Sequence, residues 1–254
     1  RLGKGGSATA FLVGQQEKEV VLKLANRSEL NDRLNTEYNT LKELRYPLIV
    51  EVFEPVQISG LSGFTMQRAG TKSLAQRLRE EGHLQLEFLQ RFGRDLLLIV
   101  EYLENNGIYH RDIKPENIGI GSVEKGKRLR LSLFDFSLAE TRLDHIHVGT
   151  PKYHDPFIGQ RKPVRWDLHA ERFTAAMTLY EMATGTLPAW GDGQTDPEML
   201  CCEVSIASEM FDANIRKAMT TFFAKAFRRD STERFDNAEE MLHAWGAVFT
   251  TVDV

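Results

Sequence analysis

The stretch that decides the fold is His110–Asn117, which reads His-Arg-Asp-Ile-Lys-Pro-Glu-Asn and is followed by Asp135 in an Asp-Phe-Ser tripeptide. Asp112 suits the acceptance of a proton from an attacking hydroxyl, and Lys114 suits the neutralisation of a moving phosphoryl group. Asn117 and Asp135 offer the oxygen ligands that Mg²⁺ prefers. The spacing therefore favours metal-assisted phosphoryl transfer. The alternative is a polar loop between a helix and a hairpin.

A glycine-rich stretch lies near the start of the chain, where residues 2–8 read Leu-Gly-Lys-Gly-Gly-Ser-Ala. Taken alone, such a stretch predicts only a turn. It precedes the apolar run Val20–Leu24, whose alternation places Val21 and Lys23 on one face of a strand.

A helix is predicted between Ser28 and Leu44, with Ser28 capping its start. Its apolar stripe consists of Leu30, Leu34, Leu41 and Leu44. Glu37 completes this stripe, and a carboxylate in an apolar seam needs a cationic partner because an unpaired buried charge is costly. Lys23 is the natural candidate. The alternative is a solvated glutamate at the edge of the stripe.

In this order, the motifs resemble the signature set of protein kinases along the whole chain. The resemblance implies a kinase that binds ATP with Mg²⁺ or Mn²⁺. It also implies that Lys23 holds the α- and β-phosphates, that Glu37 pairs with Lys23, and that Asn117 and Asp135 bind the metal. The glycine-rich loop over the phosphates would contain Gly3, Gly5 and Ala8, the last standing where the family has a third glycine.

The fold that this resemblance implies is α+β and bilobal. We expect a small antiparallel-sheet lobe with one helix at 1–66, a hinge at 67–70 and a mostly helical lobe at 71–254. The apolar positions of Leu86–Asn105 independently predict a helix. Ile118–Ile120 and 129–134 predict a hairpin, with 125–128 as its solvated turn.

Matching positions in the family also suggest an adenine pocket. Met66 would be the gatekeeper, and the backbones of Gln67 and Ala69 would face the edge of adenine. The roof would contain Ala10 and Val21, and Gly119 would replace a leucine in the floor. We therefore expect a roomier pocket, weak ATP affinity and tighter binding in a Gly119→Leu variant.

Thr150 belongs to Gly149–Tyr153, a segment that resembles the kinase substrate platform. Thr150 would form hydrogen bonds near Asp112 and Lys114. Lys114 and Thr150 together resemble serine/threonine kinases, whereas tyrosine kinases have a different sequence after the aspartate. The expected acceptors are therefore serine and threonine hydroxyls of protein substrates, including those of the kinase itself.

Two structural residues of the family also have matches. Asp167 matches the buried aspartate that holds the catalytic loop through backbone amides, and it begins a helix that runs to Gly185. Arg234 matches the arginine that anchors the helical lobe. Its usual glutamate partner is replaced by Phe157, which leaves Asp155 as the nearest substitute.

Arg111 suggests a kinase whose arginine pairs with an anion on the activation segment. Thr141 is the one hydroxyl-bearing residue between Ser137 and Thr150. We hypothesise that Asp144 instead supplies a permanent anion, so that the domain is partly active without phosphorylation. His145, His147 and His154 lie nearby, but no acidic or cysteine partner at suitable spacing completes a zinc set.

A narrower resemblance covers 166–197. Its Asp-Leu-His-Ala-Glu-Arg-Phe and Glu-Met-Ala-Thr-Gly-Thr-Leu-Pro runs look like kinase domains of bacterial phage-growth-limitation (BREX-type) defence proteins. Those are large multidomain kinases. The chain also begins without methionine, almost within the glycine-rich loop, so we expect a domain from a longer protein with flanking domains.

Composition agrees with one two-lobed domain. The chain has 254 residues, of which 42% are hydrophobic, and this is enough for a sizeable core. A net charge of −4 gives no hint of nucleic-acid binding. Two adjacent cysteines make no disulfide framework, which favours the cytoplasm, and no apolar run approaches the length of a membrane span.

Two hypotheses from different classes remain. The first is an active serine/threonine protein kinase. The second is a pseudokinase, an ATP-binding or regulatory scaffold with the same fold. Scaffolds typically lose at least one of five residues that are all present here, namely Lys23, Glu37, Asp112, Asn117 and Asp135.

Overall fold

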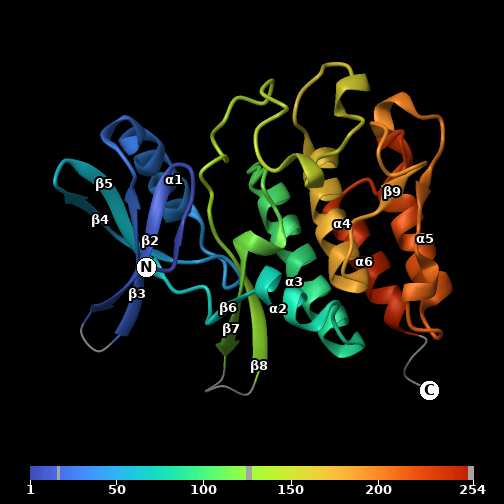
Figure 1. Cartoon of the computed structure of the whole chain (residues 1–254), viewed down its shortest axis with the longest axis horizontal. Helices are drawn as coiled ribbons and strands as arrows, with labels where there is room; N and C mark the ends of the chain where they lie inside the picture. The colour runs from blue at the N-terminus through green and yellow to red at the C-terminus, as the bar shows by residue number, and fades with distance from the viewer. Residues whose placement is uncertain (16–17, 124–127, 251–254) are drawn as a thin grey trace. The chain divides into compact units, whose positions relative to one another are not determined.

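The computed structural model describes residues 1–15, 18–123 and 128–250, and it confirms the predicted α+β class (Figure 1). Contacts divide the chain into two compact units. The first contains residues 1–72 and 118–140, and the second contains residues 73–117 and 141–254. The hairpin that follows the catalytic loop in sequence therefore belongs with the N-terminal sheet.

The first unit is built around a five-stranded antiparallel sheet with the order β1-β2-β3-β5-β4. Lys23 on β3 lies opposite Ala10 on β2, and Val21 lies opposite Met66 on β5. Opposite residues of an antiparallel pair share a face, so these four side chains project from the same face of the sheet. The strands are Gly3–Lys4 (β1), Ala8–Gln15 (β2), Lys18–Ala25 (β3), Val52–Ile58 (β4) and Leu61–Gln67 (β5).

Helix α1 (Asn31–Glu43) provides the helical element of this unit and packs against β5. The central part of its predicted stripe is present, because Leu34, Glu37 and Leu41 are all buried, whereas Leu30 lies before the helix and is half-buried. The predicted cap is wrong. Ser28 instead begins a short 3₁₀ turn, Ser28–Leu30, and its hydroxyl donates to the Glu29 carboxylate. The chain therefore enters α1 through a tighter turn whose first residues are exposed to solvent.

The hairpin of β7 (Ile118–Val123) and β8 (Arg128–Leu133) confirms the predicted strands. The predicted turn at 125–128 lies mostly outside the described residues. Two backbone hydrogen bonds join this hairpin to the segment between α1 and β4. They run from Val50 N–H to the Leu133 carbonyl and from Leu133 N–H to the Leu48 carbonyl. Strand β6 (Lys72–Ser73) lies beside β7 and completes a three-stranded sheet.

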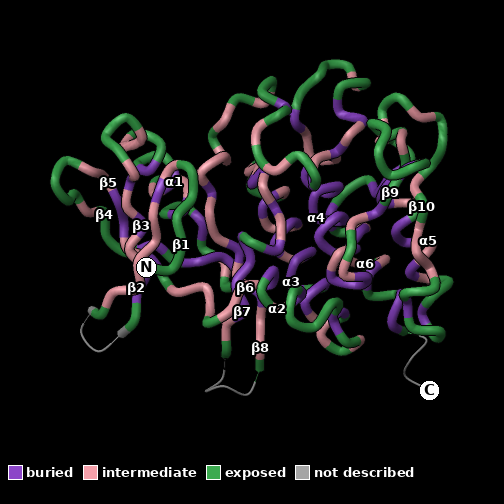
Figure 2. The backbone as a smooth tube through the Cα atoms, viewed as in Figure 1, coloured by how far each residue is buried: buried purple, intermediate pink, exposed green. Residues whose placement is uncertain are grey.

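The second unit is mainly helical, and α4 (Leu168–Thr184) forms its centre. The Asp167 carboxylate caps α4 by accepting from the N–H of Ala170. Nearly every residue of this helix is buried (Figure 2). Helix α3 (Leu86–Asn105) has the predicted bounds and packs against α4 and α6. The other elements are α2 (Leu74–Glu81), β9 (Ala189–Trp190), β10 (Val204–Ser205), α5 (Arg216–Ala226) and α6 (Ala238–Phe249).

An aromatic cluster fills the space between α4 and α5. Phe223 lies 5.0 Å from Tyr180 and 5.8 Å from Phe227, measured between ring centroids, and Trp245 of α6 covers its other side. Each of these rings is almost fully buried. This core packs against α4, and Thr178 of α4 donates to the carbonyl of Ile113, in the loop that contains Asp112. Among the described residues, no helix has both the length and the apolar character needed to cross a membrane.

Candidate active site

The first unit assembles a buried ion-pair cluster around Lys23. Its ammonium group lies 2.6 and 2.8 Å from the two carboxylate oxygens of Glu37, and 2.8 Å from Oδ1 of Asp135. Burial alone would lower the pKa of Lys23, but both carboxylates outweigh it and raise that pKa above its usual value. The predicted pairing of Lys23 with Glu37 is confirmed, and the charged lysine is the stable form.

Asp135 reaches this cluster through an unusual backbone conformation. Its φ is +68°, in the left-handed region, whereas the described non-glycine residues with positive φ do not include Ser137. The serine that replaces the usual glycine therefore needs no left-handed conformation here. The next residue, Phe136, is 1% exposed, and its N–H donates to the Glu37 carboxylate. Helix α1 thereby positions both Lys23 and the backbone after Asp135.

The glycine-rich turn between β1 and β2 is closed by its own backbone and by one side chain. Gly5 N–H donates to the carbonyl of Ala8, which already belongs to β2 and is buried. The amide of Asn26 donates to the carbonyls of Gly5 and Gly6, at 2.9 and 3.2 Å. Sequence reasoning missed Asn26. The signal was available, since an asparagine directly after the lysine strand suits backbone hydrogen bonding at a turn.

The predicted hinge has a partly different geometry from that expected. Gln67 N–H donates to the carbonyl of Glu51 at 2.7 Å, so this group is already engaged. The backbone of Ala69 makes no hydrogen bond to another described residue. Met66 is buried at the end of β5, on the same face as Val21 and Lys23. The Gln67 N–H is therefore not available to a ligand, and the Ala69 carbonyl lies close to β7 at Gly119.

The expectation of extra room at Gly119 is wrong. A Cβ atom at this position would lie 2.5 Å from the Cβ of Ala69, closer than real side-chain contacts allow. Glycine is required here because the hinge passes directly over β7, and an isolated glycine in a strand often marks such a close approach. The space assigned to a missing leucine is already filled by Ala69.

The second unit brings the predicted catalytic-loop residues together around Asp112. Lys114 Nζ lies 2.7 Å from one Asp112 oxygen and 2.5 Å from the Thr150 hydroxyl. Thr150 donates to the other Asp112 oxygen at 2.7 Å, and Asn117 Nδ2 donates to Asp112 at 2.9 Å. The predicted contacts of Thr150 with Asp112 and Lys114 are confirmed. Asp112 is thereby held in a single orientation by three donors.

The same loop leaves a suitable oxygen for a metal ion. The amide nitrogen of Asn117 is occupied by Asp112, which directs its Oδ1 oxygen away from that contact. Within the described residues, Oδ1 has no hydrogen-bond partner. In the first unit, the Asp135 side chain is 35% exposed. An amide oxygen and an accessible carboxylate are the donor types that suit Mg²⁺.

The residue that holds the catalytic loop is Glu171, and the prediction of Asp167 is wrong. Glu171 is 2% exposed, and its carboxylate accepts from the backbone N–H of His110 at 2.7 Å and of Arg111 at 3.1 Å. Burial raises the pKa of this carboxyl, and the donated hydrogen bonds act against that rise. The Asp167 carboxylate instead caps α4 and forms an ion pair with Arg161.

Arg111 contacts backbone carbonyls of the activation segment. Its guanidinium donates to the carbonyls of Thr141 at 2.7 Å, Arg142 at 3.0 Å and His145 at 2.6 Å. The hypothesis that Asp144 supplies an anion to Arg111 is wrong as a direct contact. The Asp144 carboxylate instead pairs with Arg142, at 3.1 and 2.7 Å, on the protein surface.

Asp155 does replace the missing glutamate. Both terminal nitrogens of Arg234 contact its carboxylate, one of them at 3.2 Å, and the two side chains are 4% and 0% exposed. Arg161 forms a second ion pair with the same carboxylate. The buried carboxylate thus joins the residues that follow the Pro151–Tyr153 turn to the segment before α6.

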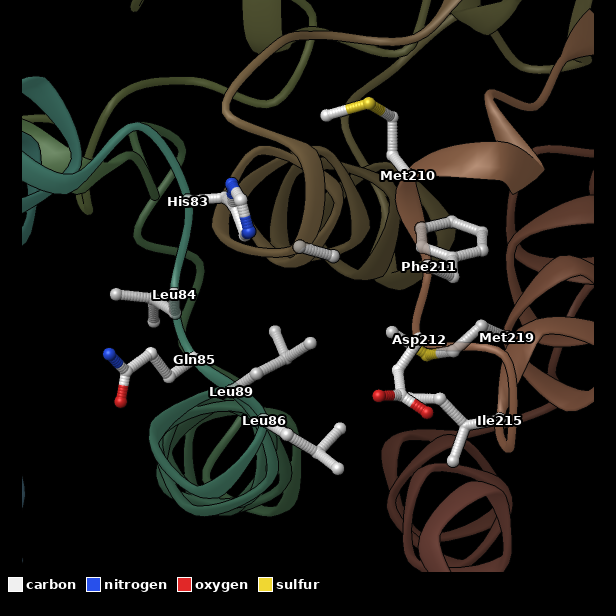
Figure 3. A pocket seen from close by; sticks show the side chains of 11 residues that line it. His83, Leu84, Gln85, Leu86, Leu89, Met210, Phe211, Asp212, Ile215 and Met219 are labelled. Atoms are coloured by element: carbon white, nitrogen blue, oxygen red, sulfur yellow. The ribbon is translucent and has the colours of Figure 1, made fainter.

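A separate hollow lies at the N-terminal end of α3 (Figure 3). Its volume is about 270 Å³, and apolar side chains of α3 and α5 form much of its wall. Leu86, Leu89, Ile215 and Met219 line it, together with His83 and Asp212. None of the predicted site residues lines this hollow, so it is not part of the candidate active site.

The sequence model of the protein kinase domain matches residues 1–246. The chain belongs to the protein kinase family. The predicted resemblance is therefore confirmed across nearly the whole chain. The buried lysine–glutamate pair and the assembled catalytic loop are the structural counterparts of that match.

Relatives of this kinase domain come from bacteria and eukaryotes. Probable kinase PglW from Streptomyces coelicolor is 35% identical over 98% of this chain, which covers 18% of that protein. A probable serine/threonine-protein kinase from Clostridium perfringens is 25% identical over 85% of the chain, which covers 32% of it. Ribosomal protein S6 kinase alpha-3 from Mus musculus is 26% identical over 99% of the chain, which covers 35% of it. The kinase domain thus spans about a fifth to a third of these relatives.

Proposed function

We propose that this kinase domain transfers the terminal phosphoryl group of ATP to serine or threonine hydroxyls of protein substrates, itself included. The observation that carries the proposal is the network in which Lys114 and Thr150 both contact Asp112. This network orients an anionic base with a cation beside it. Such an arrangement suits an attacking hydroxyl that must lose its proton as charge develops on the phosphoryl group.

Each side chain has a distinct role in this reaction. Asp112 accepts the proton of the substrate hydroxyl while the oxygen of that hydroxyl attacks the terminal phosphorus atom of ATP. ADP leaves with the electrons of the broken P–O bond. Lys114 stabilises the charge on the transferred group, and Lys23 binds the phosphates of ATP. Mg²⁺ or Mn²⁺ at Asn117 and Asp135 would supply additional positive charge to the phosphates.

The nucleotide site that we propose lies on one face of the N-terminal sheet. Ala10, Val21 and Met66 would contact adenine, with the backbones of Gln67 and Ala69 at its edge and Gly119 below. Gly3, Gly5 and Ala8 would cover the phosphates. The completeness of this set favours an active enzyme over a pseudokinase, because scaffolds typically lose at least one of the charged residues.

The test is transfer of labelled phosphate from ATP to a generic protein substrate with Mg²⁺. Asp112→Asn should reduce the rate by about 10²–10⁴-fold, the typical contribution of a general base. Asp135→Asn should abolish transfer, and Lys23→Met should weaken both ATP placement and rate. Asp144→Asn is the matched control, because this exposed aspartate pairs at the surface with Arg142 and lies 4.0 Å from His145. Undiminished transfer by Asp135→Asn would refute the proposed function.

We also propose a wider biological role from the relatives. The identity of 35% to Probable kinase PglW supports the narrower resemblance to bacterial phage-growth-limitation kinases. The full protein would then be a cytoplasmic multidomain kinase in phage defence, without nucleic acid or membrane as a direct partner of this domain. The test is phage plating on cells that produce the full protein either as wild type or as the Asp112→Asn variant. Equal protection by both forms would contradict a role for the kinase reaction.

A further inference from the structure

The activation segment from Thr141 to Thr150 is held by contacts to its backbone. Arg111 spans three of its carbonyls through charge-assisted hydrogen bonds, which are stronger than hydrogen bonds between neutral groups. The Arg111 side chain is itself buried, although the accepting segment is partly exposed. Arg111 therefore holds the segment through its backbone carbonyls, whatever side chains the segment carries. We call this set of three hydrogen bonds the Arg111 clasp.

Trp166 adds a second set of contacts to the same segment. Its backbone N–H donates to the carbonyl of Leu143 at 2.7 Å, and its indole N–H donates to Glu171 at 2.8 Å. The Arg111 guanidinium lies 5.1 Å from the centre of the Trp166 ring. Ile146 of the segment is buried in a cluster that includes Trp166. One tryptophan thus contacts the segment, the arginine clasp and the glutamate that holds the catalytic loop.

We propose that Arg111 and Trp166 are positioning residues that fix the activation segment on the catalytic loop, so that phosphoryl transfer needs no phosphate on this segment. The proposal rests on the proposed kinase function and explains how its catalytic groups stay aligned. It also replaces the hypothesis of a permanent anion at Asp144 with a contact to backbone oxygens.

The two arginines that the structure places at the segment, Arg111 and Arg142, are both already engaged and so are not ready to receive a phosphate. Thr141 is the one hydroxyl residue between Ser137 and Thr150, and its own carbonyl already accepts from Arg111. The neighbouring Arg142 is paired with Asp144. The Arg111 Nε–H is buried without a partner among the described residues, and its burial keeps it from a phosphate at the surface.

The effect on catalysis passes through the end of the segment. Gly149 has a φ of +111°, and a Cβ there would lie 2.7 Å from the Arg111 carbonyl, so the segment turns tightly against the loop. The next residue, Thr150, donates to Asp112. A displacement of about 1 Å in a catalytic group can cost roughly 10²-fold in rate. Release of the segment should therefore lower kcat while leaving ATP binding in the other unit largely unchanged.

The experiment compares kcat and the KM for ATP in phosphatase-treated wild type and in four variants, one of them a control. We expect treated wild type and Thr141→Val to stay within about twofold of untreated wild type. Arg111→Met should lower kcat by about 10²-fold with little change in KM. Trp166→Phe keeps a ring beside Arg111 but removes the indole N–H, so its loss should be smaller. Trp190→Phe is the matched control, because Trp190 is buried and its indole N–H has no partner among the described residues.

A second measurement does not depend on activity. Hydrogen exchange of 141–148 should be slow in unphosphorylated wild type and in Trp190→Phe, and faster in Arg111→Met. Wild-type kcat in Arg111→Met, or equal exchange in that variant, would overturn the proposal. Loss of activity on phosphatase treatment, with recovery on rephosphorylation of Thr141, would also overturn it. A wild type without transfer in any state would refute the proposed kinase function, and exchange would still test the clasp.

Discussion

The exchange of Glu171 for glutamine should destabilise this protein far more than the same change at Asp167. Glu171 accepts from two backbone N–H groups and one indole N–H, and all three donors lie at a buried carboxylate. Glutamine keeps one oxygen but places an NH₂ group against at least one of these donors. A buried donor without an acceptor costs about 1–3 kcal/mol, and loss of the charged acceptor weakens the remaining bonds.

A total of about 3 kcal/mol for Glu171→Gln follows from these terms. For a protein of this size, 1 kcal/mol corresponds to roughly 2–4 °C in melting temperature, so we expect a decrease of roughly 6–12 °C. Asp167→Asn should cost about 1 kcal/mol or less, because asparagine caps helices as well as aspartate does and only a partly exposed ion pair is lost.

The assay is thermal unfolding of both variants by circular dichroism, at equal concentration and without ATP. It reports on the stability of the fold and not on activity. If Asp167→Asn lowers the melting temperature more than Glu171→Gln does, the assignment of Glu171 to the catalytic loop is wrong and the alignment from sequence is right.

Three further outcomes are expected. Gly119→Leu should bind ATP more weakly than wild type in calorimetry, because the leucine side chain would collide with Ala69. Tighter binding would show that the pocket below Gly119 has free space after all. Asp155→Asn should lower the free energy of unfolding by about 3–5 kcal/mol in urea titrations, because Arg234 is left as a buried cation without a carboxylate. A loss below about 1 kcal/mol would contradict this reasoning. Asn26→Ala should raise the KM for ATP severalfold with a smaller effect on kcat, since it frees the glycine-rich turn; an unchanged KM would show that the turn is ordered without this amide.

Sequence alone predicted the residues whose chemistry is local or whose charge demands a partner. Glu37 is an example, because a carboxylate in an apolar stripe must meet a cation and Lys23 lies on the strand that precedes its helix. The same argument, applied to α4, would have found Glu171. That helix is buried on nearly all sides, so a carboxylate inside it needs donors as well.

Asp167 and Glu171 could not be separated by helical periodicity. They are four residues apart and so lie on the same side of the helix start. What decides between them is the cap, because an aspartate at the N-cap turns its carboxylate back to its own helix. Asp167 is consumed locally, whereas Glu171 remains available for long-range contacts with His110 and Arg111.

The predictions for Gly119 and Asp144 were wrong for different reasons. The space at Gly119 depends on its distance from a segment far away in sequence, and the partner of Asp144 depends on a local turn. Strand alternation gives the face to which a Gly119 side chain would point, but not how near the hinge passes. The charge of Asp144 is evident from sequence, but its capture by Arg142, two residues earlier, depends on the local turn. The clasp of Arg111 on carbonyls leaves no trace in side-chain chemistry, so no residue pattern indicates it.

The contact between Lys23 and Asp135 has a consequence for the order in which ligands arrive. In the free protein the ammonium group already neutralises the carboxylate on which a divalent cation would depend. Any such cation must compete with a tethered charge at 2.8 Å, so bare metal should be a poor ligand. If Lys23 binds nucleotide phosphates as we propose, they would give it a replacement anion and would release Asp135. We therefore expect metal and nucleotide to bind as one complex. Until then, the ammonium group of Lys23 neutralises the Asp135 carboxylate in place of the metal ion.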